Sequence, residues 1–188
     1  QQFLGIVVGE TERLTRLVNQ VLDMAKIESG HAEWRSSEVD LRALLNQAVQ
    51  TTAEMFRERG ATVALQMPPR LRTLHADPDR LTQVLLNLLS NAAKLVPRGS
   101  GRIEVRLLAD DAGATVEVQD NGPGVPREEQ QLVFEKFRQG GDALNRPQGT
   151  GLGLPISRQI VEHFGGRMWL RSPPGQGACF GFMLPWAG

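Results

Sequence analysis

Residues 114–125 read ATVEVQDNGPGV, and this stretch joins an expected strand to a glycine-rich turn. Its first six residues alternate between apolar and polar side chains, which predicts a strand with one buried face. Asp120 follows at the end of that strand, directly before Asn121 and Gly122. Asn-Gly and Pro-Gly pairs are common in turns, and an Asp beside them can cap the local backbone. The rest of the chain decides whether Asp120 has a further role.

Length and charge limit the classes of protein that the chain can represent. Its 188 residues suffice for one principal domain with an appended element. The 21 basic residues balance 21 acidic residues, so the formal net charge is zero. This balance gives no support for binding to nucleic acid or to a membrane surface.

Cysteine content and the chain start indicate the setting of the protein. Cys179 is the only cysteine, which excludes an internal disulfide framework and a cysteine-based zinc cluster and suits the reducing cytoplasm. No apolar run is long enough to span a bilayer. Because the chain opens with Gln1 rather than Met, we expect a fragment of a longer protein, which leaves room for a membrane anchor elsewhere.

The N-terminal segment has the pattern of a long helix. Residues 3–28 contain no proline, and apolar side chains recur at steps of three and four, as in a coiled coil. These seam residues are Phe3, Val7, Leu14, Leu17, Val21 and Met24. Glu10 interrupts the seam, and further apolar residues widen it, namely Val8, Val18, Leu22 and Ile27. A four-helix bundle explains this width, and a helix packed on the core of its own domain is the alternative.

The remainder of the chain alternates between helices and strands. We expect helices at 41–59, at 77–95, near 127–137 and from 149–154 to about 164. We expect strands at 61–67, 71–76, 101–110, 114–120, 166–172 and 178–185. A polar loop is expected at 138–148. The strands at 61–67 and 71–76 flank a Pro-Pro turn, and those at 101–110 and 114–120 form an antiparallel pair. The order predicts an α+β fold, a two-layer α/β sandwich with helices on one face of a mixed sheet, preceded by the long N-terminal helix. We divide the chain into that helix (1–30), a linker (31–37) and the main domain (38–188).

One face of the helix at 77–95 carries polar residues beside a core of leucines. Asn87 and Asn91 are four residues apart and Lys94 lies three further on, so all three share a face. A carboxamide oxygen is a suitable ligand for Mg²⁺, and a lysine supplies a point charge for phosphate. The alternative is an ordinary surface face with two Asn and one Lys.

A second candidate element is the run GTGLGL at 149–154, which opens a helix. Glycines let a backbone approach a ligand closely, and the free N–H groups at a helix start favour anions. The run is neither a Walker loop nor a dinucleotide fingerprint. Together with Asp120 and the Asn87, Asn91 and Lys94 face, it supplies the parts of a Mg-nucleotide site.

Five motifs in order give the chain a family resemblance. LLNLLSNAAK (85–94), DNGPGV (120–125), FEKF (134–137), GTGLGL (149–154) and GQG (175–177) resemble the N, G1, F, G2 and G3 boxes of the sensor histidine kinase catalytic domain, a member of the ATPase superfamily shared with gyrase, Hsp90 and MutL. The resemblance covers residues 37–185 and implies the Bergerat-type ATP-binding fold. The leading helix resembles the second helix of the family's dimerisation domain.

The resemblance also implies roles for individual residues. Asp120 would accept a hydrogen bond from the adenine amino group, Asn91 would bind Mg²⁺, and Asn87 and Lys94 would act at the phosphates as the catalytic residues. The implied ATP-binding residues are Asn87, Asn91, Lys94, Leu95, Asp120, Gly122, Gly124, Val125, Lys136, Phe137, Arg138, Gly149, Thr150, Gly151, Leu152 and Gly153. Gly122 and Gly124 would let the backbone approach the base. Residues 138–148 would form a mobile lid anchored by the packing of Phe134 and Phe137, while Lys136 and Arg138 are candidate phosphate contacts or solvated charges.

Two departures from the family pattern bear on function. Leu95 follows Lys94 where the family commonly has an aromatic residue, so stacking on the base is lost. The histidines are His31 in the linker, His75 at a strand end and His163 near a helix end, and none has the setting of the family's phosphoacceptor. We therefore expect a protein-histidine kinase core whose acceptor histidine lies outside this chain.

The implied partners are ATP, the acceptor-histidine helix of the same or a partner protomer, and a response regulator receiver domain, with a homodimer in the full-length protein. Two alternatives stay open. One is a nucleotide-binding pseudokinase that serves as a dimeric signalling scaffold, and the other is a serine kinase or ATPase of the same superfamily. In the gyrase and Hsp90 branches a glutamate acts as general base at the place of Asn87. Because Asn cannot take up a proton at neutral pH, the kinase is favoured over the hydrolase.

Overall fold

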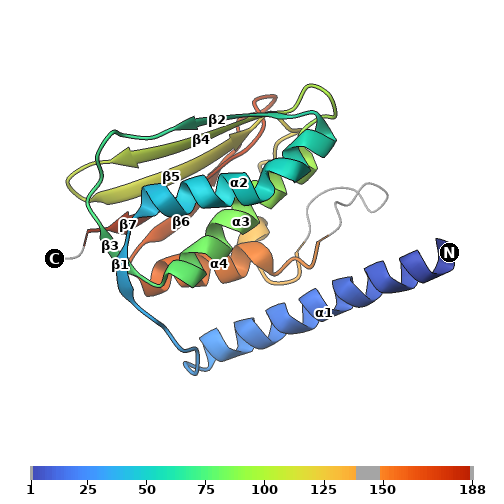
Figure 1. Ribbon diagram of the computed structural model, residues 1–188, viewed down its shortest axis with the longest axis horizontal. Coiled ribbons are helices and arrows are strands. Elements are labelled where there is room, and N and C mark those ends of the chain that lie inside the picture. The colour runs from blue at the N-terminus through green and yellow to red at the C-terminus, as the bar shows by residue number, and fades with distance from the viewer. Residues whose placement is uncertain (1, 139–148, 187–188) are drawn as a thin grey trace.

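The structure is a computed structural model that describes residues 2–138 and 149–186. A mixed five-stranded sheet carries helices on one of its faces, and a long helix α1 (Gln2–Glu28) crosses beneath them (Figure 1). This two-layer α+β arrangement confirms the predicted fold class.

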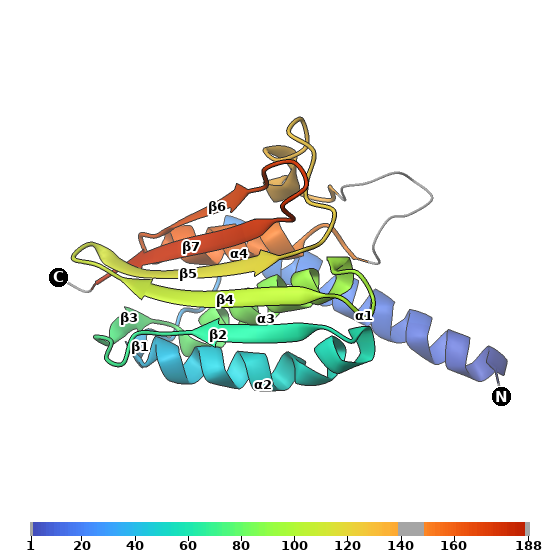
Figure 2. The ribbon, with the colours of Figure 1, turned by 90° about the horizontal axis from the view of Figure 1, so that it is seen from above.

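The sheet has the strand order β2-β4-β5-β7-β6, seen from above in Figure 2. Its strands are β2 (Thr62–Gln66), β4 (Arg102–Ala109), β5 (Gly113–Asp120), β7 (Cys179–Pro185) and β6 (Arg167–Arg171). Only β2 and β4 run parallel, and the other neighbours are antiparallel, including the predicted pair β4 and β5. On β5 the apolar residues Val116 and Val118 are buried in the core, as the alternation of this strand predicted.

The expected turn between the strands at 61–67 and 71–76 does not pair them. β2 joins the main sheet, whereas β3 (Leu74–Ala76) pairs antiparallel with β1 (Ser37–Val39) in a separate two-stranded sheet. Pro68 and Pro69 lack the N–H groups that a hairpin ladder needs beside its turn, so the chain leaves the sheet here.

Three helices cover one face of the sheet, and side chains define where they begin. These helices are α2 (Leu41–Arg59), α3 (Pro78–Leu95) and α4 (Gly153–His163). Asp40 caps α2 and Asp77 caps α3, each accepting two backbone N–H groups. The short helix expected near 127–137 is reduced to one 3₁₀ turn, η1 (Leu132–Phe134).

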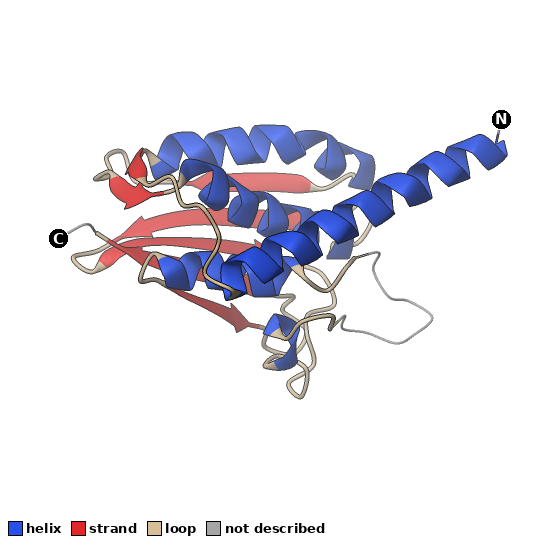
Figure 3. Ribbon diagram, turned by 90° about the horizontal axis from the view of Figure 1, so that it is seen from below, coloured by secondary structure: helices blue, strands red, loops and turns tan. Residues whose placement is uncertain are grey.

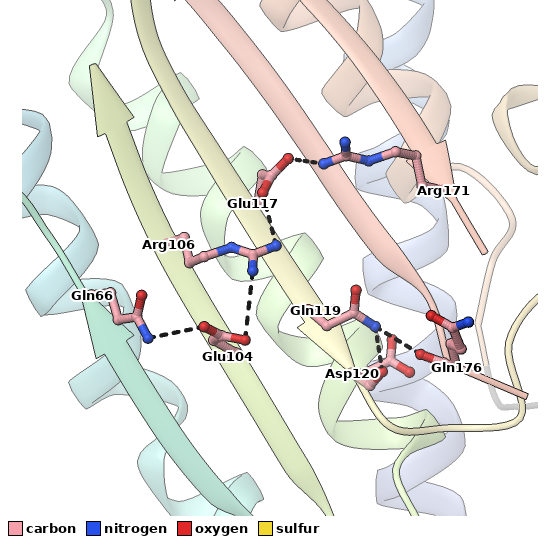
Figure 4. Close-up of polar contacts among 8 residues, drawn as sticks. All are labelled: Gln66, Glu104, Arg106, Glu117, Gln119, Asp120, Arg171 and Gln176. Carbon is pink, nitrogen blue, oxygen red and sulfur yellow. Dashed lines mark hydrogen bonds and ion pairs between the residues drawn. The ribbon is translucent and has the colours of Figure 1, made fainter. Parts of the chain in front are cut away.

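The other face of the sheet is a layer of charged side chains. Glu117 on β5 lies between Arg106 of β4 and Arg171 of β6 and pairs with both (Figure 4). The arginines cover the Glu117 carboxylate so completely that the residue is only 6% exposed. A charge buried in this way is stabilised by its paired partners. Cys179 is also buried, and burial raises the pKa of its thiol.

Some apolar residues of α1 pack against the main domain, and others are exposed to solvent. Met24 is 5% exposed, and Leu17 and Ile27 pack partly against the core of the main domain. The remaining apolar residues with described side chains are exposed: Val7, Val8, Leu14, Val18, Val21 and Leu22. One side of α1 therefore lies on its own domain, as the alternative reading held, and the other side is free to pack elsewhere. The side chain of Phe3 lies outside the described residues.

The predicted linker is held against the main domain. Trp34 stacks on His163 with ring centroids 3.7 Å apart and planes at 9°. The backbone N–H of Arg35 donates to Asp77 at 2.8 Å, and β1 begins at Ser37, the last residue of the predicted linker. Within the described part of the chain, no helix is both long and apolar enough to cross a membrane.

Candidate functional site

A large cleft of about 2170 Å³ lies between α1, α3, the start of α4 and the turn that follows β5. Figure 3 shows α1 crossing the layer that contains α3 and α4. Residues far apart in the sequence meet in this cleft, because α3 supplies one wall and the segments at 123–127 and 149–155 supply others.

The polar face of α3 lines the cleft. Asn87, Asn91 and Lys94 all border it and are all partly buried, while Leu88 and Leu89 point into the core. No described residue hydrogen-bonds the Asn91 side chain, so its carboxamide oxygen is available to a ligand. Burial, followed by the nearby charge of Arg16, lowers the pKa of the Lys94 ammonium. A negatively charged phosphate beside Lys94 would stabilise the charged ammonium and so oppose this decrease in pKa.

The start of α4 packs directly on Asn87. The Asn87 amide donates to the hydroxyl of Ser157 at 3.0 Å. A Cβ on residue 153 would lie 2.3 Å from Asn87 Oδ1, so only glycine permits this approach. Asn87 is therefore fixed by α4, and the first residues of α4 border the same cleft as the polar face of α3.

Asp120 lies buried at the end of β5, with 3% of its surface exposed. Its Oδ1 accepts the N–H of Gly122 at 2.8 Å and that of Ala178 at 3.3 Å. Burial raises the pKa of the Asp120 carboxyl, and these two hydrogen bonds oppose the increase. Both hydrogen bonds from described residues use Oδ1, which leaves Oδ2 as an acceptor for a ligand.

The glycines after Asp120 are explained by contacts within the protein. A Cβ on Gly122 would lie 2.8 Å from the carbonyl oxygen of Leu95, and a Cβ on Gly124 would lie 2.8 Å from Ser172 Oγ. Ser172 in turn accepts the N–H of Val125 at 2.8 Å. The turn therefore packs closely on the end of α3 and is hydrogen-bonded to the segment after β6. Leu95, Gly124 and Val125 border the cleft.

The segment at 149–152 divides between the cleft and the core. Gly149, Thr150, Gly151 and Gly153 border the cleft. Leu152 is fully buried, so its side chain belongs to the core. Its backbone N–H donates to Thr150 Oγ1 within the same segment. The Thr150 hydroxyl also donates to Gln20 of α1.

The residues at 134–138, around the start of the predicted lid, have different surroundings. Lys136 forms an ion pair with Glu28 of α1 and does not border the cleft, whereas Arg138 does border it and pairs with Glu135 at 3.3 Å. Phe134 packs edge-to-face on Phe180. The expected packing of Phe137 is wrong, because this side chain is 63% exposed and its φ is 61°. Residues 139–148 of the predicted lid lie outside the described residues.

Several residues of the cleft were not found from the sequence. Ser157, which fixes Asn87, and Ser172, which fixes the turn, are single serines without a motif. Gln130 donates to the carbonyl oxygens of both Val125 and Ser172. Arg16 and Gln20 of α1 also border the cleft. Their spacing of four residues is a weak signal that both lie on one helix face.

Comparisons with known proteins identify what this arrangement is similar to. The chain is 35% identical to the circadian input-output histidine kinase CikA of Synechococcus elongatus over 98% of its length, and it spans 25% of that protein. It resembles the crystal structure of full-length ShkA in complex with AMPPNP with a TM-score of 0.85 and 31% identity, covering 99% of this chain and 38% of ShkA.

A further similar structure is that of the histidine kinase ThkA in complex with the response regulator protein TrrA. The TM-score is 0.75 at 25% identity, and the match covers 100% of this chain and 51% of ThkA. The family model described as histidine kinase-, DNA gyrase B- and HSP90-like ATPase matches residues 76–188. This match includes α3, the Asp120 turn, the 149–154 segment and the last two strands, so the chain belongs to the family of histidine kinase-, DNA gyrase B- and HSP90-like ATPases.

Proposed function

We propose that the chain is the ATP-binding kinase core of a two-component sensor histidine kinase. It would transfer the γ-phosphoryl group of ATP to a histidine that lies outside this chain. The observation that carries the proposal is the cleft that brings the Asn87, Asn91 and Lys94 face of α3 together with the start of α4. The buried Asp120 does not itself border this cleft, but Gly122, which donates to it, lies against Leu95 of the cleft wall. CikA, which is similar in sequence, and ThkA, which is similar in structure, are both named histidine kinases.

The residues divide the binding of ATP between base and phosphates. Asp120 Oδ2 accepts a hydrogen bond from the adenine amino group, and Leu95 and Val125 provide apolar contact beside it. Lys94 and the N–H groups at the start of α4 stabilise the phosphates. With ATP held in this way, a neutral imidazole nitrogen forms the N–P bond as the bond from phosphorus to the ADP oxygen breaks. Positioning supplies most of the rate, because phosphoryl transfer needs little covalent chemistry from the protein.

Asn87 distinguishes phosphoryl transfer from hydrolysis. It borders the cleft as a neutral amide, hydrogen-bonded to Ser157, and it cannot act as general base for water. This favours the kinase over an ATPase. The pseudokinase scaffold is the second candidate, because Leu95 offers no ring to stack on the base and the apolar side of α1 is exposed.

Mg²⁺ fits the cleft through Asn91. Within the described part of the chain no cluster of three His, Cys, Asp or Glu side chains could hold a metal, so the ion would take its ligands from the Asn91 carboxamide, water and phosphate oxygens. The ion would neutralise charge on the phosphates.

Replacing Asn91 tests this metal assignment. We expect Asn91→Ala to weaken Mg-ATP binding about tenfold, or about 1.4 kcal/mol, and metal-free ATP binding much less. Calorimetric titrations with Mg²⁺ and with EDTA measure both affinities. Asn19→Ala on the exposed side of α1 is the matched control. Equal losses in the two titrations would make Asn91 a structural residue.

The partners and location follow from this function. We infer that the exposed side of α1 packs in a homodimeric helical bundle that contains the acceptor histidine, and that a response regulator receiver domain takes the phosphoryl group from it. Cytoplasmic ATP and the unpaired Cys179 favour a cytoplasmic location.

Radiolabelling with Mg-ATP tests the kinase proposal. The histidines of this chain do not border the cleft, and His163 is stacked on Trp34, so we expect the chain alone to stay unlabelled. A longer chain with the preceding helix should give acid-labile phosphohistidine, and Asp120→Asn in that longer chain should abolish it.

Other outcomes would contradict the proposal in distinct ways. Acid-stable label on Ser or Thr would indicate a serine kinase, and rapid phosphate release without label would indicate an ATPase. A longer chain that binds Mg-ATP but never becomes labelled would favour the scaffold.

A further inference from the structure

The C-terminal half of α1 is fixed on the main domain at a defined rotation. Asp23 accepts hydrogen bonds from Arg80 at 2.6 Å and from Gln83 at 2.9 Å, both on α3. The side chains of the Asp23 and Arg80 ion pair are each 19% exposed, and Met24 beside them is buried. A partly buried pair with two hydrogen bonds holds its geometry better than an exposed one.

Two further contacts continue along the same face of α1. Gln20 accepts a hydrogen bond from Thr150 of the 149–154 segment, and Glu28 pairs with Lys136. Gln20, Met24 and Glu28 follow one another at steps of four residues and so lie on one side of the helix, and Asp23 lies three residues after Gln20 at the edge of that side. This side of α1 faces the cleft and its border.

Arg16 lies one helical turn before Gln20 on this side. It borders the cleft together with Lys94 of α3, and its charge contributes to the lowered pKa of Lys94. Within residues 2–138 and 149–186, Arg16 forms no ion pair, whereas its neighbour Arg13 is paired with Glu10 at 2.9 Å. Five further arginines among the described residues border the cleft, and within this cationic border the charges of Arg16 and Lys94 repel each other.

The acidic residues of the cleft do not neutralise these cations. Asp79 and Glu129 also border the cleft, but among the described residues neither pairs with Arg16 or Lys94. Asp79 lies fifteen residues before Lys94 on α3, which is about 22 Å along the helix axis. An anion between Arg16 and Lys94 would turn their repulsion into attraction.

We propose that Arg16 is a phosphate-binding residue of the ATP site, supplied by α1 rather than by the main domain. The inference rests on the ATP site of the proposed function. It makes the affinity for ATP depend on the docking of α1, because Arg16 reaches the cleft only while Asp23 and Gln20 hold the helix in place. The N-terminal helix is then part of the nucleotide site as well as a surface for other helices.

Binding of ATP and of adenosine to the chain tests this role. We expect Arg16→Gln to weaken ATP binding about tenfold and to leave adenosine binding unchanged, because adenosine has no phosphate. Arg16→Lys should recover most of the ATP affinity, and the loss should shrink as salt is raised. Lys26→Gln is the matched control, since Lys26 is an exposed cation on α1 that does not border the cleft.

A double-variant cycle tests the dependence on docking. Asp23→Asn should weaken ATP binding to a similar extent, and adding it to Arg16→Gln should cause little further loss. Arg16→Gln with unchanged ATP affinity, equal losses for ATP and adenosine, or Asp23→Asn with full ATP affinity would each overturn the inference. If the unaltered chain binds no ATP at all, the proposed function itself fails, which is a separate outcome.

Discussion

Asp120 is a buried carboxylate, and its negative charge destabilises the folded protein when no nucleotide is bound. Burial raises its pKa above the usual value near 3.9, and among the described residues only Gly122 and Ala178 donate to it. A raised pKa in the folded state means that stability present below the unfolded pKa is lost as pH rises through the folded pKa. At neutral pH the ionised Asp120 therefore lowers the free energy of unfolding, and an adenine amino group would compensate for this loss.

Asp120→Asn separates binding from stability. We expect ATP affinity to fall about 10- to 100-fold, or about 1–3 kcal/mol, because the amide can present a donor to the amino group. The free energy of unfolding should stay equal or rise, and the difference in favour of Asn should grow as the pH rises from the usual carboxyl pKa through the raised pKa of Asp120. Nucleotide titration and urea unfolding at several pH values measure both. Asp111→Asn, at an exposed turn, is the control, and unchanged ATP affinity would remove Asp120 from the base pocket.

The first turn of α4 packs directly against α3. Gly153 and Asn87 are in contact there, and Ser157 adds a hydrogen bond one turn further along α4. The approach is close because residue 153 has no side chain. The cleft depends on this contact, since the start of α4 and the polar face of α3 are two of its walls.

Gly153→Ala should disturb this contact between the elements. The new Cβ would lie 2.3 Å from Asn87 Oδ1, so α4 or Asn87 must move. We expect a loss of about 1–3 kcal/mol in the free energy of unfolding, measured by urea denaturation, together with weaker ATP binding. Adding Asn87→Ala makes room for the methyl group and should restore most of the stability. A single variant as stable as the original chain would show that the contact is not tight.

At the scale of the whole molecule, α1 has two functional sides. One side is fixed to the main domain through Asp23 and Met24, and the other exposes an apolar stripe that includes Leu14, Val18 and Leu22. Contiguous exposed apolar residues on a soluble surface mark an interaction site. The exposed side is therefore available to a bundle while the docked side stays on the cleft.

Charging the stripe should prevent self-association without affecting the nucleotide site. In the longer chain with the preceding helix, we expect Leu14→Asp with Leu22→Asp to raise the dimer dissociation constant at least about a hundredfold, because each buried Leu contributes about 1.5–3 kcal/mol. Analytical ultracentrifugation measures this, and ATP affinity should be unchanged. Asn19→Asp on the same helix serves as the control. A dimer that persists in the double variant would place the interface elsewhere.

The sequence by itself determined most of the helices and strands and the order of the site motifs. Alternation in residues 114–120 predicted a strand, because the period at which side chains are buried is a local property of the sequence. The spacing of Asn87, Asn91 and Lys94 placed them on one face for the same reason. The five motifs pointed to the family before any geometry was known.

Only the tertiary structure decided which segments meet. β2 and β3 are neighbours in sequence, yet they lie in different sheets, because strand pairing depends on partners such as β4 and β1 that are distant along the chain. The glycines at 122 and 124 are required by contacts with Leu95 and Ser172, which no local pattern shows. Arg16 and Lys94 are 78 residues apart and border one cleft because Asp23 and Arg80 fix α1 on α3. Such long-range contacts form only when separate elements pack together, so local patterns in the sequence do not predict them.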